Sequence, residues 1–185
     1  MDVTAVLNLL THGNQLKRTA RTGWVQRGVP QAENVAAHSF GVVYTALALA
    51  GLAEPPVNLA RVLAMAALHD LPESLTSDIP TPAWRYLPPN IKTDVERGVM
   101  QTIVADAPFA PHWLALWEEL HAAETAEARL VHDADKLELF LQAHMYARQT
   151  GNRQLEEFWT NPHQFHFAAA QAIYAELRRQ RLTQA

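Results

Sequence analysis

Apolar residues recur every three or four positions along most of the chain, which is the spacing of amphipathic helices. In residues 36–50 and 59–68 this spacing holds throughout, and neither segment shows the alternation of apolar and polar residues that is typical of a strand. Gly51 and Gly151 mark two of the breaks between helical segments. Helices are also predicted in four further segments: 91–104, 112–121, 124–148 and 163–181. The pattern therefore predicts an all-α fold, a compact multi-helix bundle.

A proline-rich segment, residues 78–90, interrupts the helical pattern. Proline removes a backbone donor and restricts the residue before it, so we expect an irregular loop here. Trp84, Tyr86 and Leu87 give this loop apolar surface, which predicts that it packs against the helices. With 185 residues, 49% of them hydrophobic, the chain is long enough to form a core of its own. Residues 1–185 are therefore predicted to form a single domain.

The composition of the chain limits the chemistry that it can perform. The absence of cysteine excludes disulfides, thiolate metal sites and cysteine nucleophiles, and leaves histidine and carboxylates as the strong metal ligands. The net charge is −4 without a long basic stripe, which argues against a duplex nucleic acid partner and favours a small-molecule substrate. The longest apolar run, residues 41–53, is too short to cross a bilayer, and the amino terminus lacks the basic region of a signal peptide. We therefore expect no membrane association and a cytoplasmic location.

The ionisable residues that follow the apolar segment 59–68 are the clearest chemical signal in the sequence. His69 and Asp70 come directly after that segment, and Glu73 and Asp78 follow. Burying such groups is costly unless they pair with each other or bind a metal ion. On a continuous helix Glu73 would lie four residues after His69 and three after Asp70, so all three side chains would face one pocket. The cluster therefore predicts a metal site.

Two further ligands are available at a distance in the sequence. His38 lies near the start of the preceding helical segment, and Asp135 lies within segment 124–148. Together with His69 and Asp70 they provide two imidazoles and two carboxylates. Such a set suits Mn, Fe, Co, Ni or Zn and leaves coordination positions open for water, as a hydrolase requires.

Four motifs follow one another in an order that resembles the H…HD…D signature of HD-domain metal-dependent phosphohydrolases. They are ENVAAHSF (33–40), ALHDLPES (67–74), DIPTP (78–82) and VHDADKLELF (131–140). Residues 16–38, LKRTARTGWVQRGVPQAENVAAH, are similar to the opening of the 5′-deoxynucleotidase subgroup of that family. The resemblance implies a single HD domain, one divalent metal ion and the release of phosphate from (deoxy)nucleoside 5′-monophosphates. The identity of the ion, Mg included, stays open.

The resemblance also implies roles for individual residues. Glu73 and Asp78 take the acid–base and substrate-orienting positions, and Trp24 borders the nucleoside. General acid and general base remain alternatives for Glu73, because a carboxyl group can serve as either. The metal ligands that the resemblance implies are His38, His69, Asp70 and Asp135.

The chain departs from the family pattern at two positions. In bacterial members of the subgroup an arginine stands directly before the matching tryptophan, whereas this chain has Gly23 there. The contact to the substrate phosphate is therefore expected from another basic residue, and we choose Arg18. Pro72 disfavours helical geometry at the residue before it, so Glu73 is expected to point differently from its family counterpart. The basic candidates are Lys17, Arg18, Arg21 and Arg27.

Other functions remain compatible with this sequence. The same constellation serves HD hydrolases of guanosine alarmones, nucleoside triphosphates and cyclic dinucleotides, although the small number of basic residues favours a monophosphate. Outside enzymes, the alternative is a non-catalytic helical module with a structural metal ion. His163 and His166 have no apparent acidic partner, and we interpret them as structural. The resemblance, together with spare apolar surface in segment 163–181, also predicts a homodimer.

Overall fold

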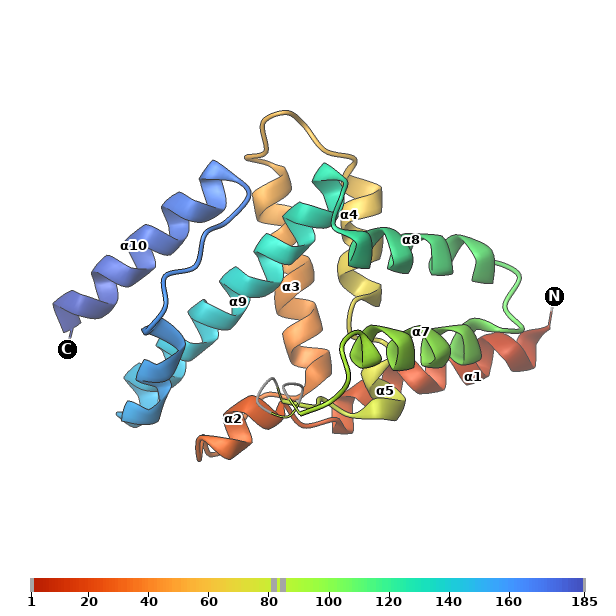
Figure 1. The fold of residues 1–185 in the computed structure, drawn as a ribbon, viewed down its shortest axis with the longest axis horizontal. Coiled ribbons are helices and arrows are strands. Elements are labelled where there is room, and N and C mark those ends of the chain that lie inside the picture. Colours follow the sequence, from red (N-terminus) through yellow and green to blue (C-terminus); the bar gives the residue numbers. More distant parts are fainter. Residues whose placement is uncertain (1, 81–82, 84–85, 185) are drawn as a thin grey trace.

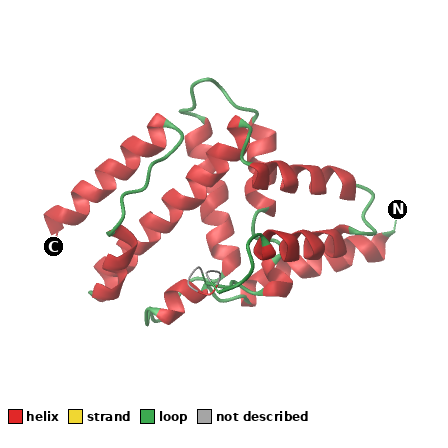
Figure 2. Ribbon diagram, viewed as in Figure 1, coloured by secondary structure: helices red, strands yellow, loops and turns green. Residues whose placement is uncertain are grey.

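The computed structural model describes residues 2–80, 83 and 86–184. All regular structure within these residues is helical, and they contain no strand (Figure 2). The predicted all-α class is confirmed. None of the described helices combines the length and the apolarity that crossing a membrane requires. The elements are α1 (Val3–Gln15), η1 (Leu16–Arg18), α2 (Thr22–Gln26), α3 (Val35–Ala50), α4 (Leu59–Leu68), α5 (Glu73–Thr76), α7 (Ile91–Val104), α8 (Ala110–Ala122), α9 (Ala126–Thr150), η2 (Arg153–Trp159) and α10 (Ala168–Gln184).

Helix α3 lies at the centre of the molecule, where it packs against α9 and α4 (Figure 1). Its apolar positions Val35, Val42, Ala46 and Leu49 are buried, in keeping with the helical spacing in the sequence. Burying one valine or leucine side chain stabilises a fold by about 1.5–3 kcal/mol. These three helices therefore form a packed centre from which the site residues project.

Side-chain caps define where the central helices begin. Asn34, Asn58 and Thr125 precede α3, α4 and α9, and each side chain accepts a hydrogen bond from a backbone N–H of the first turn. One such cap contributes about 1 kcal/mol. At the other end of α9, Gly151 has a φ of 67°, a left-handed conformation that favours glycine. The caps explain why the helices begin close to the residues that the sequence pattern predicts.

The sequence pattern does not predict helix α1. Asp2 caps it by accepting hydrogen bonds from two backbone N–H groups of the first turn. Ala5 and Leu9 are buried, so one face of the helix packs on the core. The exposed face mixes polar residues with apolar ones, so the segment carries an amphipathic pattern that the prediction omits. Its exposed apolar members are Val3, Leu7 and Leu10.

The last predicted helix, 163–181, begins later than its pattern indicates, at Ala168. The buried carboxylate of Asp133 accepts hydrogen bonds from the backbone N–H groups of His166 and Phe167, at 3.0 and 2.8 Å. Nδ1 of His166 also donates to Asp133, at 2.8 Å. These contacts hold the chain in a loop before α10. The expectation that His166 has no acidic partner is therefore wrong.

The proline-rich segment 78–90 is described only in part. Residues 81–82, and Trp84 with its expected packing, lie outside the described residues. Tyr86 is 82% exposed and Leu87 is 42% exposed. Tyr86 therefore adds little buried surface to the loop, whereas more than half of Leu87 is covered.

Candidate metal centre

The four side chains that the sequence suggests as metal ligands meet between the central helices. His38 projects from α3 and Asp135 from α9, while the other two residues follow the end of α4. Nε2 of His38 lies 3.1 Å from Oδ1 of Asp135 and 3.6 Å from Oδ2 of Asp70. Nε2 of His69 lies 3.4 Å from Nε2 of His38 and 3.2 Å from Oδ2 of Asp70. We call these four side chains the ligand cluster.

The spacing of the ligand cluster fits a metal ion. Bonds of about 2.0–2.2 Å to nitrogen and oxygen ligands set neighbouring ligand atoms roughly 3–3.5 Å apart. The separations of 3.1 to 3.6 Å lie in or next to this range. Oδ2 of Asp70 is buried but has no hydrogen-bond partner among the described residues. Such an oxygen is costly to bury, and a cation held by the cluster would supply its missing partner.

A tight turn after α4 directs two adjacent residues to this point. α4 ends at Leu68, and the backbone N–H of Glu73 donates to the carbonyl oxygen of Asp70 at 3.0 Å. This hydrogen bond spans three residues and does not continue the helix. The helix thus ends where the predicted segment 59–68 ends, and Pro72 interrupts it before Glu73 as expected. Pro72 has no N–H to lose, and its φ of −56° suits the residue before α5.

Hydrogen bonds behind the cluster fix the orientation of both imidazoles. Nδ1 of His69 lies 2.7 Å from the carbonyl oxygen of Ala66. Nδ1 of His38 lies 2.6 Å from Oε2 of Glu138. A carbonyl oxygen and a carboxylate only accept, so each Nδ1 donates and each Nε2 is left for the metal side. This arrangement is typical of metal-ligating histidines.

Glu138 is a functional residue that the sequence analysis misses. It approaches His38 across Gly41, where a Cβ atom would lie only 2.8 Å from Oε1 of Glu138. Glycine at this position therefore gives the carboxylate room to reach the imidazole. Glu138 follows Asp135 by three residues, so both lie on one face of α9. That spacing is visible in VHDADKLELF and is the signal by which Glu138 can be found.

The charges of the cluster shift the pKa values of its members. Burial lowers the pKa of His38, but hydrogen bonds to Asp135 and Glu138 outweigh burial and raise it to about 10. Burial raises the pKa of Asp70, but the charges of His69, His38 and Arg21 and a hydrogen bond to His69 together outweigh burial and hold the pKa well below its usual range. The pKa of Asp135 is likewise lowered, because its hydrogen bond to His38 and the charges of both histidines together outweigh burial. Both carboxylates are therefore ionised at neutral pH, as cation binding requires.

Glu73 and Asp78 lie beside the cluster. Glu73 is 5% exposed, and its Oε2 is buried without a hydrogen-bond partner among the described residues. Burial, followed by the charges of Asp70 and Asp78, raises the pKa of Glu73 to about 9. Oδ2 of Asp78 accepts a hydrogen bond from the backbone N–H of Thr22 at 2.7 Å, at the start of α2. Asp78 therefore holds α2 next to the cluster.

A cleft of about 570 Å³ opens beside Asp70 and Asp135. Trp24 and Phe158 both line it, and we call these two side chains its aromatic floor, although Trp24 is only 2% exposed. The indole N–H donates to Glu33 at 2.9 Å, and the ring of Phe158 lies 4.9 Å from the indole ring. The cleft therefore has a rigid aromatic floor next to the cluster.

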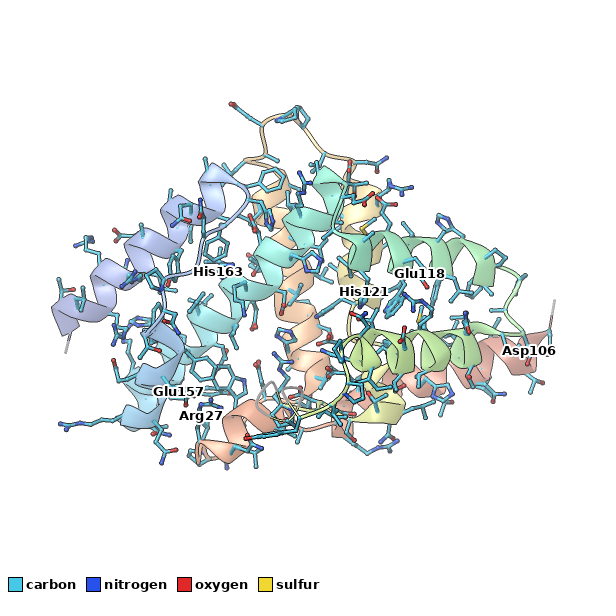
Figure 3. All side chains as sticks on the ribbon, viewed as in Figure 1. Arg27, Asp106, Glu118, His121, Glu157 and His163 are labelled. Atoms are coloured by element: carbon cyan, nitrogen blue, oxygen red, sulfur yellow. The ribbon has the colours of Figure 1, made fainter. Side chains whose placement is uncertain are left out.

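The basic residues expected near the phosphate differ in position. Arg21 and Arg27 line the cleft. Nη1 of Arg21 lies 3.7 Å from a carboxylate of the ligand cluster, and Arg27 pairs with Glu157 of η2 at 3.0 Å (Figure 3). Arg18 instead donates to the side chain of Gln15 at 3.1 Å and is not among the residues that line the cleft. The structure brings Arg21, rather than Arg18, to the ligand cluster.

A comparison with known protein families shows which family has this arrangement of residues. The model of the HD domain family matches residues 13–174, a range that includes the whole ligand cluster. The chain belongs to the HD-domain family. The H…HD…D order that suggested the ligands is thus the order of a family to which the chain does belong.

Two curated proteins illustrate the similarity of this HD-domain chain to its relatives. The 5′-deoxynucleotidase HDDC2 of Danio rerio is 31% identical over 169 residues, which cover 90% of this chain and 83% of the relative. The 5′-deoxynucleotidase HDDC2 of Homo sapiens is 30% identical over 142 residues, or 77% of this chain and 68% of the relative. A solved structure, a conserved hypothetical protein from Pyrococcus furiosus, has a TM-score of 0.81 and 32% identity over 94% of this chain and 99% of its own.

Metal affinity should fall in a graded way when the HD-domain cluster is altered. Asp70→Ala removes a proposed ligand, so we expect the variant to lose most of the roughly one divalent ion per chain that the cluster can hold. Glu138→Gln removes only the carboxylate behind His38, and we expect affinity to fall about 10- to 100-fold. Elemental analysis and chelator competition measure the two effects.

Asp106→Ala is the matched control for this series. Asp106 is exposed in the connection between α7 and α8, on the side of the molecule away from Arg27 and the cleft (Figure 3). We expect this variant to keep its metal. Stoichiometric metal in both Asp70→Ala and His38→Ala would contradict the ligand assignment.

Proposed function

We propose that this HD-domain protein is a metal-dependent phosphohydrolase that releases phosphate from deoxynucleoside 5′-monophosphates. The observation that carries the proposal is the direct contact between the ligand cluster and a cleft with an aromatic floor and basic side chains. Such a cleft offers one end to a nucleobase and the other to a phosphate. The names of the similar curated proteins, 5′-deoxynucleotidases, support the same substrate class.

In this proposal the ligand cluster holds one divalent cation. A cation bound there would neutralise phosphoryl charge and lower the pKa of water. The protein contributes two carboxylates, which bring negative charge, and two imidazoles, which are kept in orientation by Ala66 and Glu138. The mixed nitrogen and oxygen donors suit first-row divalent ions. The four residues are His38, His69, Asp70 and Asp135.

Arg21 takes the phosphate-binding role that the sequence analysis assigned to Arg18. Its side chain is 15% exposed and lies in the cleft next to Asp70. Burial lowers the pKa of Arg21, but Asp70 and the neighbouring carboxylates outweigh burial and raise the pKa. The guanidinium therefore stays charged and can donate to two phosphoryl oxygens at once.

Trp24 and Phe158 form the surface against which a nucleobase would lie. The cleft volume of about 570 Å³ falls within the range of about 300–1,000 Å³ that is usual for small-molecule sites. Trp24 is fixed by its hydrogen bond to Glu33 and by an edge contact with Tyr146, whose ring centroid is 5.5 Å away. A fixed aromatic floor limits how far the base can rotate. It therefore directs the 5′-phosphate to the ligand cluster.

Glu73 is the residue that we propose for proton transfer. Its buried carboxyl lies beside the cluster and has a pKa of about 9, raised by burial and then by Asp70 and Asp78. A carboxyl group that holds a proton at neutral pH can donate it to a leaving oxygen. Asp78 acts as a positioning residue, because it accepts hydrogen bonds from Thr22. Thr22 lies between Arg21 and Trp24 in the chain, so Asp78 holds the proposed phosphate and base contacts at a fixed distance from each other.

The arrangement of acidic groups favours hydrolysis with one ion over the cyclic-dinucleotide alternative. A second group of possible ligands exists among the described residues, namely Glu33, His38 and Glu138. It shares His38 with the ligand cluster, and Glu138 already binds that imidazole. The described residues therefore offer no independent site for a second ion.

A nucleotide panel tests the proposed function. We expect phosphate release from deoxynucleoside 5′-monophosphates and poor release from the 3′-isomers, because a base on the aromatic floor brings only the 5′-phosphate to the cluster. A colorimetric phosphate assay with Mn, Co, Zn or Mg measures the rates. Equal rates on the two isomers would contradict the proposal. Faster hydrolysis of triphosphates, alarmones or cyclic dinucleotides would favour the alternative HD activities.

Replacing Glu73 with glutamine tests its role in proton transfer. We expect Glu73→Gln to keep its metal and fold, because the exchange is nearly isosteric, while kcat falls by on the order of 10²-fold or more. Steady-state kinetics on the best nucleotide, with metal analysis alongside, make the measurement. Glu118→Gln is the control, since Glu118 of α8 pairs with Arg97 of α7 and does not line the cleft. A kcat within about threefold of wild type would remove Glu73 from the mechanism.

We also propose that the protein forms a homodimer through the outward face of α3. Phe40 and Tyr44 are 71% and 67% exposed, Leu47 is exposed beside them, and α3 contains no Asp, Glu, Lys or Arg. Two copies of this face can meet without charge repulsion. Each aromatic side chain can bury about 150–250 Å². Phe40 and Tyr44 thus supply part of the roughly 800 Å² per partner of a standard interface. Phe40, Tyr44 and Leu47 lie closer together along α3 than the exposed apolar residues Ile173 and Leu182 lie along α10.

Sedimentation equilibrium tests this interface. We expect a dimer for the wild type and a weaker or absent dimer for Tyr44→Lys, because a lysine would bring two positive charges together at the contact. Leu7→Lys is the matched control, since Leu7 is similarly exposed but lies on α1. A wild-type protein that stays monomeric at all concentrations would contradict the proposal.

A further inference from the structure

A second pocket, of about 400 Å³, lies between the end of α9, η2 and α10. These elements form the part of the molecule that carries the C-terminus (Figure 1). The pocket shares no lining residue with the cleft at the metal centre. One arginine from each of the three elements lines it: Arg148, Arg153 and Arg181. The pocket therefore gathers positive charge from three separate parts of the fold.

His144 lines this pocket from α9 and is 4% exposed. No hydrogen bond joins its imidazole to any residue that the structure describes. Buried polar side chains normally have such a partner. Burial, followed by the charges of Arg148 and Arg181, lowers the pKa of His144. The imidazole thus lies in a positive field and lacks a partner within the described chain.

Positively charged donors around the pocket outnumber carboxylate acceptors. Arg181 pairs with Glu156, and its guanidinium lies over the ring of Trp159 at 5.2 Å, so this arginine is held in place. Its Nε is buried without an acceptor among the described residues. Arg148 and Arg153 are exposed at the rim, and neither forms an ion pair within the described chain. Glu156 is thus one carboxylate among three guanidinium groups.

A simpler explanation accounts for only part of this arrangement. Arg148 lies in the last turn of α9, where a positive charge interacts favourably with the helix dipole. That effect does not extend to Arg153 or Arg181, which belong to other elements. The excess of positive charge is also local to this part of the chain. Residues 144–185 contain five arginines and three glutamates, whereas the whole chain has a net charge of −4.

We propose that this pocket binds a phosphate group, either as the free ion or carried by a larger molecule. The held guanidinium of Arg181 and the imidazole of His144 form its interior, and the two arginines at the rim close over the anion. Guanidinium groups suit this ligand because they donate two parallel hydrogen bonds to its oxygens. The site is distinct from the metal centre, and the proposal does not depend on the hydrolytic activity.

Histidine side-chain NMR of the metal-loaded protein tests the site during titration with inorganic phosphate. Chloride at matched ionic strength serves as the reference. We expect a saturable shift of the His144 resonances, and a midpoint raised about tenfold in the Arg148→Gln/Arg153→Gln double variant, which loses two charged donors. Both substituted residues are exposed, so folding should be preserved. Arg179→Gln is the matched control, because Arg179 binds Glu176 and does not line the pocket, and it should leave the midpoint unchanged.

A second arm identifies the source of the phosphate group. A non-hydrolysable deoxynucleoside 5′-phosphonate replaces inorganic phosphate, and a shift of His144 with either probe supports the site. Shifts confined to His38 and His69 would report binding at the metal centre alone and would overturn the proposal. It would also be overturned by no saturation up to about 50 mM phosphate. An equal weakening by Arg179→Gln would show a general charge effect and would likewise overturn it.

Discussion

The pairing of opposite charges at one point between α3, α4 and α9, around the buried imidazole of His38 and with Asp135 still 41% exposed, is the constraint on which the rest of this structure depends. Each carboxylate of the ligand cluster lies within 3.6 Å of an imidazole nitrogen, and each pairing offsets the cost of removing charge from water. A buried ionic group that loses its partner destabilises a fold by about 3–5 kcal/mol. The three helices therefore have to meet in one register, and the apolar core around them serves to keep that register.

Residues that contact His38 also lie next to the residues that hold the aromatic floor of the cleft. His38 is held by Glu138, and ligand atoms of these two residues and of Glu33 lie within 4.8 Å of one another. Glu33 in turn accepts the indole N–H of Trp24, and its own backbone N–H donates to the hydroxyl of Tyr146 at 2.8 Å. The carboxylates of Glu33 and Glu138 thus lie close together, one bound to Trp24 and the other to the proposed metal ligand His38. The aromatic floor and the proposed ligand are therefore neighbours, but the two carboxylates are joined by proximity alone.

Much of the fold is visible in the sequence because the periodic segments end at residues with clear local chemistry. The predicted segments 59–68 and 91–104 coincide with α4 and α7, and the order of the motifs suggests the four proposed ligands. The turn before Glu73 follows from Pro72, which is also visible in the sequence. The error at α10 arises where a distant contact decides the local structure, because the carboxylate of Asp133 holds residues before α10 out of the helix.

The choice among the basic residues shows the same limit. Arg18 and Arg21 are only three residues apart, and their sequence neighbours do not distinguish them. What separates them is η1, together with an isolated bridge between Ala20 and Asn34 that ties this segment to the start of α3. That bridge depends on backbone pairing, which side-chain patterns do not report. Glu138, by contrast, was within reach of sequence reasoning, because its spacing from Asp135 is local.

The long separation in sequence between His38 and the carboxylate that orients it also has a consequence for how the protein folds and persists. His38 and Glu138 are 100 residues apart, so their contact can form only after α9 has docked on α3. Closing so long a loop carries an entropic cost that local helix formation does not. A divalent ion then binds the folded chain far better than the unfolded one, and at a hundredfold excess over its Kd such a ligand adds about 2.7 kcal/mol of stability. The supply of metal in the surroundings would thus govern the lifetime of the folded protein as well as its chemistry.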